Sequence, residues 1–201
     1  MKIFEEEPFE PIFRFFRFKK GLSYIKKNKP LVLIDLGCGK KIPFYFFAKK
    51  NKIIFKKYIG IDPFVEEEIV TSLNKKKDIL ILNKALKKKI PLPSSSVDYV
   101  VAFAFLEHIK NPADIIRETL RILKPGGKII ITTPTPKAKG ILEFLSFKLK
   151  LIRRDEIAEH KNYFNKENLL YLIPKNKKLN LKIIHQYFEF GFNNLLVIIK
   201  K

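Results

Sequence analysis

Residues 31–39 form the part of the sequence that most limits how this chain can fold. They read Leu-Val-Leu-Ile-Asp-Leu-Gly-Cys-Gly, a run of branched apolar residues ended by an acid and two glycines. This pattern is typical of a parallel strand that is buried on both faces and leads into a tight turn. Gly37 and Gly39 lack a β-carbon, so the turn can take positive φ and let a ligand lie against its backbone. Taken alone, the stretch also fits a strand followed by an ordinary glycine turn.

A second expected strand, residues 57–62, also ends in an acid. Asp62 follows Gly39 by 23 residues, close to the spacing of about 20 at which an acid binds ribose hydroxyls in nucleotide-binding folds. No arginine follows Asp62 closely, so a 2′-phosphate partner is not indicated. In open α/β sheets ligands bind at the carboxyl ends of the strands. Asp35 and Asp62 place a carboxylate at this end of two separate strands. This favours a ligand site over two acids that each merely stabilise the turn after their strand.

Helical and extended patterns alternate along the rest of the chain, which is the order of an α/β fold. Asn111 and Asn165 stand where capping residues of two helices are expected. The last two strands are expected to form a terminal hairpin. Helices are predicted over residues 9–28 with a break near Gly21, 43–50, 112–123 and 165–173, and further strands over residues 79–82, 97–103, 128–133, 179–190 and 194–200.

Length and cysteine content limit the class of protein. A chain of 201 residues, 46% hydrophobic, suits one domain with a substantial core. Cys38 is the single cysteine, which excludes an internal disulfide and fits a reducing compartment. The first ten residues are acidic, and no run of about 18 apolar residues is present, so neither a signal peptide nor a membrane span is indicated. A cytoplasmic location is therefore expected.

The formal net charge of +21 invites a nucleic-acid or anionic-membrane partner. The excess, however, is nearly all lysine: the chain has 35 Lys and 6 Arg. Arginine is the residue that recognises phosphate and guanine through a fork of donors. Because the lysines are spread over the whole length, we favour a solvated surface over a binding footprint.

Two segments have a helix-spaced apolar face with lysines or arginines between, residues 9–28 and residues 140–152. A basic amphipathic helix can lie on a membrane surface. Packing of the first segment onto its own domain is the favoured interpretation. The second interrupts the βα order after a strand's carboxyl end, so it is expected to be part of a lid or substrate wall, although a packed surface helix is about as good an explanation.

Six motifs taken in order resemble those of the class I S-adenosylmethionine-dependent methyltransferases, in the branch that contains the ubiquinone-pathway O-methyltransferases. The resemblance covers about residues 30–135 and continues more weakly to the end. One departure is that Lys40 and Lys41 replace the third glycine of the usual pattern, although Pro43 matches some members. The motifs are Leu33-Ile-Asp-Leu-Gly-Cys-Gly39, Tyr58-Ile-Gly-Ile-Asp62, Val97-Asp-Tyr-Val-Val, Leu106-Glu-His-Ile109, Arg121-Ile-Leu-Lys-Pro-Gly-Gly127 and Thr132-Thr-Pro134.

The resemblance implies a three-layer Rossmann-like fold with a seven-stranded, mostly parallel sheet and an antiparallel strand in the C-terminal hairpin. Residues 1–201 would form a single domain with an N-terminal helical segment (1–29), a cofactor-binding core (30–133), a lid or substrate-wall insertion (134–160) and a final helix and hairpin (161–201). The cofactor implied is S-adenosylmethionine, and no metal ligands are expected.

Cofactor contacts are implied along the carboxyl edge of this sheet. The turn after the first strand would lie against the methionine part and Asp62 would hold the ribose hydroxyls. The loop of residues 83–86 would border the adenine, and Phe103 would offer its backbone to the methionyl amine. The full set is Asp35, Gly37, Cys38, Gly39, Asp62, Pro63, Asn83, Ala85, Phe103 and His108.

Methyl transfer to an oxygen or amine often needs a base, and the candidates are His108, His160 and Glu107. His108 has the best location, although a packing or capping role is equally compatible. His160 fits an anchor of the lid loop, and Glu107 is expected to fix its own loop.

The expected acceptor is a small or lipid-linked molecule, because the two amphipathic segments would wall the acceptor site, with peripheral membrane contact as a further partner. An RNA methyltransferase and a non-catalytic binding protein that kept the cofactor fold are the alternatives. A nicotinamide dehydrogenase is more distant, since the third glycine is missing.

Overall fold

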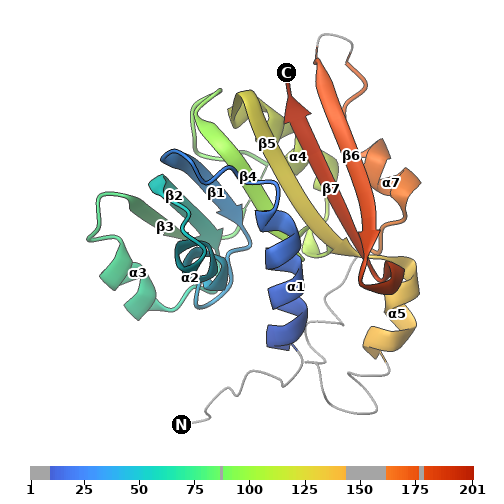
Figure 1. Ribbon diagram of the computed structural model, residues 1–201, viewed down its shortest axis with the longest axis horizontal. Coiled ribbons are helices and arrows are strands. Elements are labelled where there is room, and N and C mark those ends of the chain that lie inside the picture. The colour runs from blue at the N-terminus through green and yellow to red at the C-terminus, as the bar shows by residue number, and fades with distance from the viewer. Residues whose placement is uncertain (1–9, 87, 144–161, 177–178) are drawn as a thin grey trace.

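A computed structural model of the protein describes residues 10–86, 88–143, 162–176 and 179–201 (Figure 1). Its centre is a seven-stranded sheet in the order β3-β2-β1-β4-β5-β7-β6. The strands are β1 (Leu31–Leu36), β2 (Phe55–Asp62), β3 (Ile79–Asn83), β4 (Val97–Phe103), β5 (Leu123–Pro134), β6 (Leu181–Phe188) and β7 (Asn193–Lys200).

The first five strands are parallel, and β7 runs antiparallel to both β5 and β6. The mostly parallel seven-stranded sheet and its antiparallel terminal hairpin are thus confirmed. The strand order reverses between β1 and β4, which are neighbours. A crevice suited to ligands forms outside the carboxyl ends of the strands at such a reversal. These ends face the lower part of Figure 1, where α5 and the start of α1 lie.

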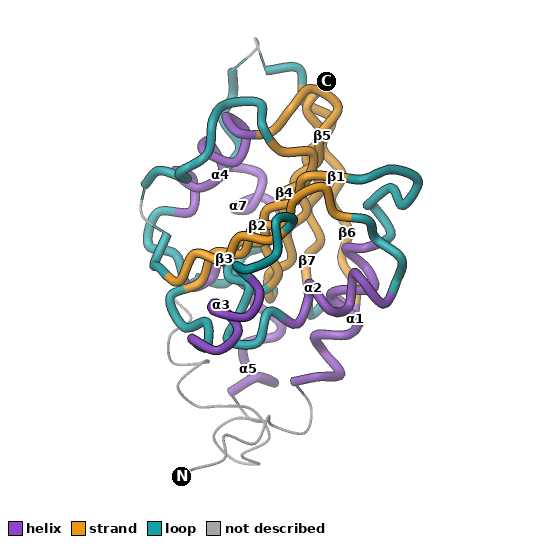
Figure 2. Tube along the Cα trace, turned by 90° about the vertical axis from the view of Figure 1, so that its left-hand side faces the viewer, coloured by secondary structure: helices purple, strands orange, loops and turns teal. Residues whose placement is uncertain are grey.

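Helices cover both faces of the sheet, and the sheet's residues alternate between two cores (Figure 2). Leu31 and Leu33 of β1 pack on the side of α1 and α2, whereas Ile34 and Leu36 pack on the side of α4 and α7. This is the near-continuous apolar pattern of a strand covered on both faces. The helical segments are α1 (Glu10–Leu22), α2 (Pro43–Lys50), α3 (Glu67–Leu73), α4 (Pro112–Ile122), α5 (Pro136–Glu143), α7 (Lys166–Tyr171), η1 (Leu106–His108) and η3 (Glu189–Gly191).

Three details differ from the expected elements. The helix α3 was not predicted, because its seven residues are too few for a clear apolar period. Asn111 stands at the N-cap of α4 but its side chain makes no capping hydrogen bond, so that expectation is wrong. Asn165 does cap α7, since its side chain accepts a hydrogen bond from the Asn168 amide.

The third difference concerns the Lys-Pro-Gly-Gly segment, which was expected to separate a helix from the fifth strand. The strand β5 instead begins at Leu123, directly after α4, and its register with β4 shifts between Val97 and Tyr99. A β-carbon on Gly127 would lie 2.9 Å from the Asp98 carbonyl oxygen and closer still to Leu123. The glycine therefore allows the irregular strand to pass beside β4.

Candidate cofactor and acceptor site

The turn after β1 has the geometry that its two glycines allow. Gly37 and Gly39 have φ values of 71° and 74°, a region that side chains disfavour. A β-carbon on Gly37 would also lie 2.5 Å from the Phe105 ring, whereas at Gly39 the nearest atom is Pro43 Cδ at 3.7 Å. The turn thus presents bare backbone on one side and is closed by Phe105 on the other.

Asp62 joins the ends of the first two strands. Its Oδ2 accepts a hydrogen bond from the Gly39 amide at 3.0 Å, and its Oδ1 accepts one from the Phe64 amide at 2.8 Å. The residue is partly exposed. A carboxylate has about four lone-pair sites, so each oxygen keeps acceptor capacity beyond these two bonds. The arrangement holds the carboxylate in place beside the glycine turn.

Asp35, the second carboxylate, lies deeper. It is only 2% exposed, and its Oδ2 accepts a hydrogen bond from the Tyr58 hydroxyl at 2.6 Å. Burial raises the pKa of Asp35 to about 7; the Tyr58 hydrogen bond opposes this rise and the charge of Asp62 adds to it. Its carboxyl is therefore buried beneath the turn and bonded to β2. Sequence reasoning missed Tyr58, although it stands in the same motif as Asp62.

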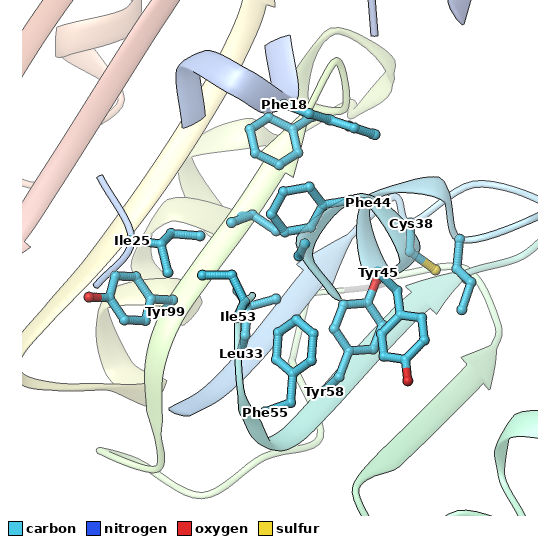
Figure 3. Close-up of a cluster of buried hydrophobic side chains, with 14 of the residues drawn as sticks. Phe18, Ile25, Leu33, Cys38, Phe44, Tyr45, Ile53, Phe55, Tyr58 and Tyr99 are labelled. Carbon is cyan, nitrogen blue, oxygen red and sulfur yellow. The ribbon is translucent and has the colours of Figure 1, made fainter. Parts of the chain in front are cut away.

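Cys38 points into the core on the α2 side of the sheet (Figure 3). Its Sγ is 2.9 Å from the position that a β-carbon on Gly60 would take. Burial raises the pKa of the Cys38 thiol well above its usual range, so the thiol packs and does not act as a nucleophile at neutral pH.

The predicted residues after β2 and β3 lie at the same edge of the sheet and are exposed. Pro63 follows Asp62 directly, while Asn83 ends β3 and Ala85 follows two residues later. The Asn83 Nδ2 donates a hydrogen bond to the Val65 carbonyl at 3.1 Å. This bond ties the loop after β3 to the loop after β2, so the predicted ribose and adenine segments are neighbours.

Phe103 is the last residue of β4 and belongs to the core. Its ring centroid lies 4.8 Å from that of Phe44 and 5.2 Å from that of Phe18 of α1, two of the rings drawn in Figure 3. A β-carbon on Gly21 would lie 2.4 Å from the Phe103 ring. The helix expected over residues 9–28 ends at Leu22, next to the break predicted near Gly21. Gly21 itself is the point at which α1 packs closely against the end of β4.

The segment after β4 brings side chains next to the glycine turn. Ala104 has a φ of 50°, and its amide donates to the Thr132 carbonyl of β5 at 3.0 Å. Such a conformation is strained for a residue other than glycine. Phe105 then covers Gly37, and η1 follows with Glu107 and with His108, which is partly buried. Predicted His160 lies outside the described residues.

Glu107 is fully buried, and among the described residues neither of its carboxylate oxygens has a hydrogen-bond partner. Burial raises its pKa to about 8; its own backbone amide and then the positive charge of Arg17 oppose the rise, and the charge of Glu10 adds to it. Its backbone carbonyl accepts a hydrogen bond from the Asn162 amide at 3.2 Å. This backbone bond ties η1 to the segment before α7, and the expectation that Glu107 fixes its own loop stays a prediction for its side chain.

Three elements meet around Glu107 through charged side chains that sequence reasoning did not connect. Arg17 of α1 donates to Glu10 Oε1 at 2.6 Å. The charge of Arg17 also lowers the pKa of both Glu107 on η1 and Glu189 on η3, although burial raises each of them overall. No motif signals this cluster, because its members are spread over about 180 residues and only the fold brings them together.

Comparison with known proteins identifies the family of this chain. A family described as "Methyltransferase domain" matches residues 12–186. The chain is 28% identical over 102 residues to a protein of Mycolicibacterium smegmatis named "Probable S-adenosylmethionine-dependent methyltransferase", an alignment covering 51% of this chain and 37% of that protein. It is 22% identical over 145 residues to a ubiquinone biosynthesis O-methyltransferase of Vibrio vulnificus, covering 71% of this chain and 61% of that one. The chain thus spans less than two thirds of the length of these relatives.

Solved structures resemble most of the chain in fold. A solved complex between a Haloferax volcanii methyltransferase activator and a methyltransferase has a TM-score of 0.70 at 15% identity, over 94% of this chain and 91% of the matched chain. An S-adenosylmethionine-dependent methyltransferase from Mesorhizobium loti has a TM-score of 0.65 at 14% identity, over 90% of this chain and 95% of that chain. At such identities the likeness concerns the fold.

Proposed function

This chain belongs to the methyltransferase-domain family, whose cofactor is S-adenosylmethionine, and we propose on that basis that it transfers a methyl group to an apolar acceptor, either a small molecule or a lipid-linked one. The observation that carries the proposal is the pairing of the bare glycine turn with Asp62 at the carboxyl edge of the sheet. That pairing stands where the strand order reverses.

The residues present fit this cofactor. A nucleoside needs acceptors for two adjacent hydroxyls, and Asp62 is held at the end of β2 with acceptor capacity left on both oxygens. The cofactor carries no phosphate, so the lysines that replace the third glycine do not remove a needed cradle. Gly39 leaves its backbone open to a ligand, because a β-carbon there would meet only Pro43. The exposed residues after β3, Asn83 and Ala85, would border the base.

When bound, S-adenosylmethionine supplies an electrophilic methyl group whose leaving group is a neutral thioether. The protein's main task is then to align the acceptor and to exclude water, and well-aligned groups gain effective molarities of about 10⁵ to 10⁸ M. Phe105 follows the end of β4 by two residues and covers Gly37. It is therefore placed to keep water from this part of the crevice. The strained backbone at Ala104 directs the chain into that position.

A proton must leave a hydroxyl or ammonium acceptor, and Glu107 is the candidate that burial and a raised pKa favour. It is fully buried two residues after Phe105, and its oxygens are without hydrogen-bond partners among the described residues. Its pKa of about 8 makes the carboxylate a stronger base than an ordinary glutamate. His108 and His160 remain the other candidates for this role.

An apolar acceptor is supported by the side chains at this edge of the molecule. Phe15 and Phe16 of α1 are about half exposed, and Phe190 of η3 is 98% exposed. A ubiquinone biosynthesis O-methyltransferase among the relatives agrees with an apolar substrate class. The charge of +21 is the observation behind the RNA alternative.

The test is to incubate the protein with S-adenosylmethionine labelled in its methyl group and with cell extract, and to separate the label into lipid, small-molecule, RNA and protein fractions. We expect label in the lipid or small-molecule fraction, with Glu107→Gln slowing its appearance about 100-fold or more. Glu118→Gln is the control with normal transfer, since Glu118 of α4 is paired with Arg121 and with the Ile90 amide.

Label in RNA that persists in moderate salt would establish the RNA alternative instead. Binding of the cofactor without label in any fraction would favour a non-catalytic binding protein.

A further inference from the structure

The outer face of α1 carries an apolar stripe that the core leaves uncovered. Ile12, Phe15 and Phe16 are spaced for one face of a helix, and they are 48%, 47% and 47% exposed. Phe18 and Leu22, on the inner face, are buried. Phe15 precedes Phe18 by three residues and Leu22 by seven, so the stripe borders the buried face and extends the apolar surface of α1 beyond the part that the core covers.

The stripe continues onto α2. The ring of Phe15 lies 5.6 Å from that of Phe16 and 5.9 Å from that of Phe47. Phe46, the next residue on α2, is 49% exposed. We call Ile12, Phe15, Phe16, Phe46 and Phe47 the aromatic ridge. It joins α1 to α2, and α2 begins four residues after Gly39.

Positive charge surrounds the aromatic ridge. Lys19 Nζ lies 5.9 Å from the centroid of the Phe15 ring, and Lys41 is exposed just before α2. Lys49 and Lys50 are exposed in the last turn of α2. Glu10, the acid at the start of α1, is paired with Arg17. Phenylalanines flanked by lysines on one helix are the composition of helices that lie in a membrane interface.

Another exposed aromatic residue belongs to the same edge of the molecule. Phe190 is 98% exposed and has a φ of 56°, directly after Glu189 with a φ of 49°. Two consecutive non-glycine residues in the left-handed region cost strain that a surface turn has no need to bear. The turn lies near α1, because Arg17 acts on the pKa of Glu189.

We infer that the aromatic ridge docks the protein on an anionic lipid bilayer, with α1 lying in the interface and the glycine turn facing the lipid. In the part of the chain that the structure describes, no helix is long and apolar enough to cross a membrane, so the contact is peripheral. The net charge of +21 complements an anionic surface, which attracts basic residues close to it. The docking itself does not depend on the proposed function. Only its purpose does, because docking would bring a lipid-linked acceptor to the site.

The experiment is co-sedimentation of the full chain with vesicles of phosphatidylcholine, with and without phosphatidylglycerol, in the absence of any methyl donor. We expect binding to the vesicles that contain phosphatidylglycerol and a loss of about tenfold or more in the double variant F15S/F16S. Phe46→Ser on α2 is the second variant and is expected to weaken binding by a smaller factor.

The matched control is the double variant I183S/Y187S, which removes exposed apolar side chains of β6 (43% and 52% exposed) at the far edge of the sheet. It should bind as the unchanged protein does. Thermal unfolding of each variant establishes that the fold is intact, which is expected because all five substituted side chains are exposed.

Three results would overturn the inference. The unchanged protein could fail to sediment with anionic vesicles. Binding could persist in both F15S/F16S and F46S, which would assign it to bulk charge. A dimer that F15S/F16S dissociates, without vesicle binding, would assign the aromatic ridge to a second copy of the chain. Failure of methyl transfer affects none of these outcomes.

Discussion

At the scale of single residues, the buried acids Asp35 and Glu107 are the costly groups of this protein. Their pKa values are raised to about 7 and about 8, in both cases chiefly by burial. A raised carboxyl pKa means that the folded state holds a proton that the unfolded chain releases. Stability from these groups is full below the unfolded pKa near 4 and is lost as pH rises through 7 and 8. Groups kept at such a cost are commonly functional.

Replacement of Glu107 by glutamine should therefore stabilise the protein in alkaline but not in acid solution. Each pKa unit corresponds to about 1.4 kcal/mol, so the shift of Glu107 implies a gain of a few kcal/mol for Glu107→Gln above pH 8 that disappears below about pH 4.5. Urea unfolding across this pH range measures it. Glu118→Gln should behave oppositely, because Arg121 lowers the pKa of Glu118 and the variant loses stability at neutral pH. A Glu107→Gln curve parallel to that of the unchanged protein would contradict the account.

Gly37 is a second residue whose identity has a physical reason. Gly37→Ala and Gly126→Ala both place a side chain at positive φ, 71° and 78°, but only the first meets an obstacle, the Phe105 ring at 2.5 Å. We expect Gly126→Ala to cost about 1 kcal/mol and Gly37→Ala to cost clearly more, as judged by urea unfolding of the two variants side by side. Equal costs would show that Phe105 does not close the turn.

At the scale of elements, the sequence predicted well wherever a strand or helix is buried on a regular period. The helix over residues 43–50 and the strand over 97–103 were predicted with the bounds that the structure gives. The helix α3 was missed because a seven-residue helix has too short a period, and β5 starts at Leu123 because a register shift absorbs the proline and glycines.

The residues of the site likewise fall into those that the sequence predicts and those that it does not. The glycine turn and Asp62 were found from local spacing, whereas the Tyr58–Asp35 bond and the Arg17–Glu107 approach depend on tertiary packing. No local pattern distinguishes these residues from an ordinary core tyrosine or a surface arginine.

The docking of α1 on the sheet depends on the close approach of Gly21 to Phe103. Gly21→Ala would place a β-carbon 2.4 Å from the ring, so we expect α1 to loosen at a cost of about 1–3 kcal/mol and residues 10–25 to exchange amide hydrogens faster. Gly140→Ala is the control, since it adds a methyl group to α5 in open space and should favour that helix by about 0.5–1 kcal/mol. Unchanged exchange in Gly21→Ala would refute the role of this contact.

At the scale of the whole molecule, the topology explains why residues distant in the sequence form one site. The strands β1 and β4 are neighbours at the point where the strand order reverses, so the turn after β1 and the segment after β4 lie together. The helix α1, which precedes the sheet in the chain, packs on β4 and α2 and contributes Arg17 to the same edge. The glycine turn, the buried Glu107 and the aromatic ridge are thus consequences of one strand order.

Isothermal titration calorimetry of S-adenosylmethionine into the unchanged protein and Asp62→Ala tests the central claim most directly. We expect the unchanged protein to bind one cofactor per chain. The variant would lose two charge-assisted hydrogen bonds to the ribose hydroxyls, worth about 1.5–3 kcal/mol each, so its affinity should be at least about tenfold weaker. Asp78→Asn, before β3 at the opposite edge of the sheet, should bind normally. Equal affinity in Asp62→Ala, or no binding by the unchanged protein, would contradict the assignment of this edge as the cofactor site.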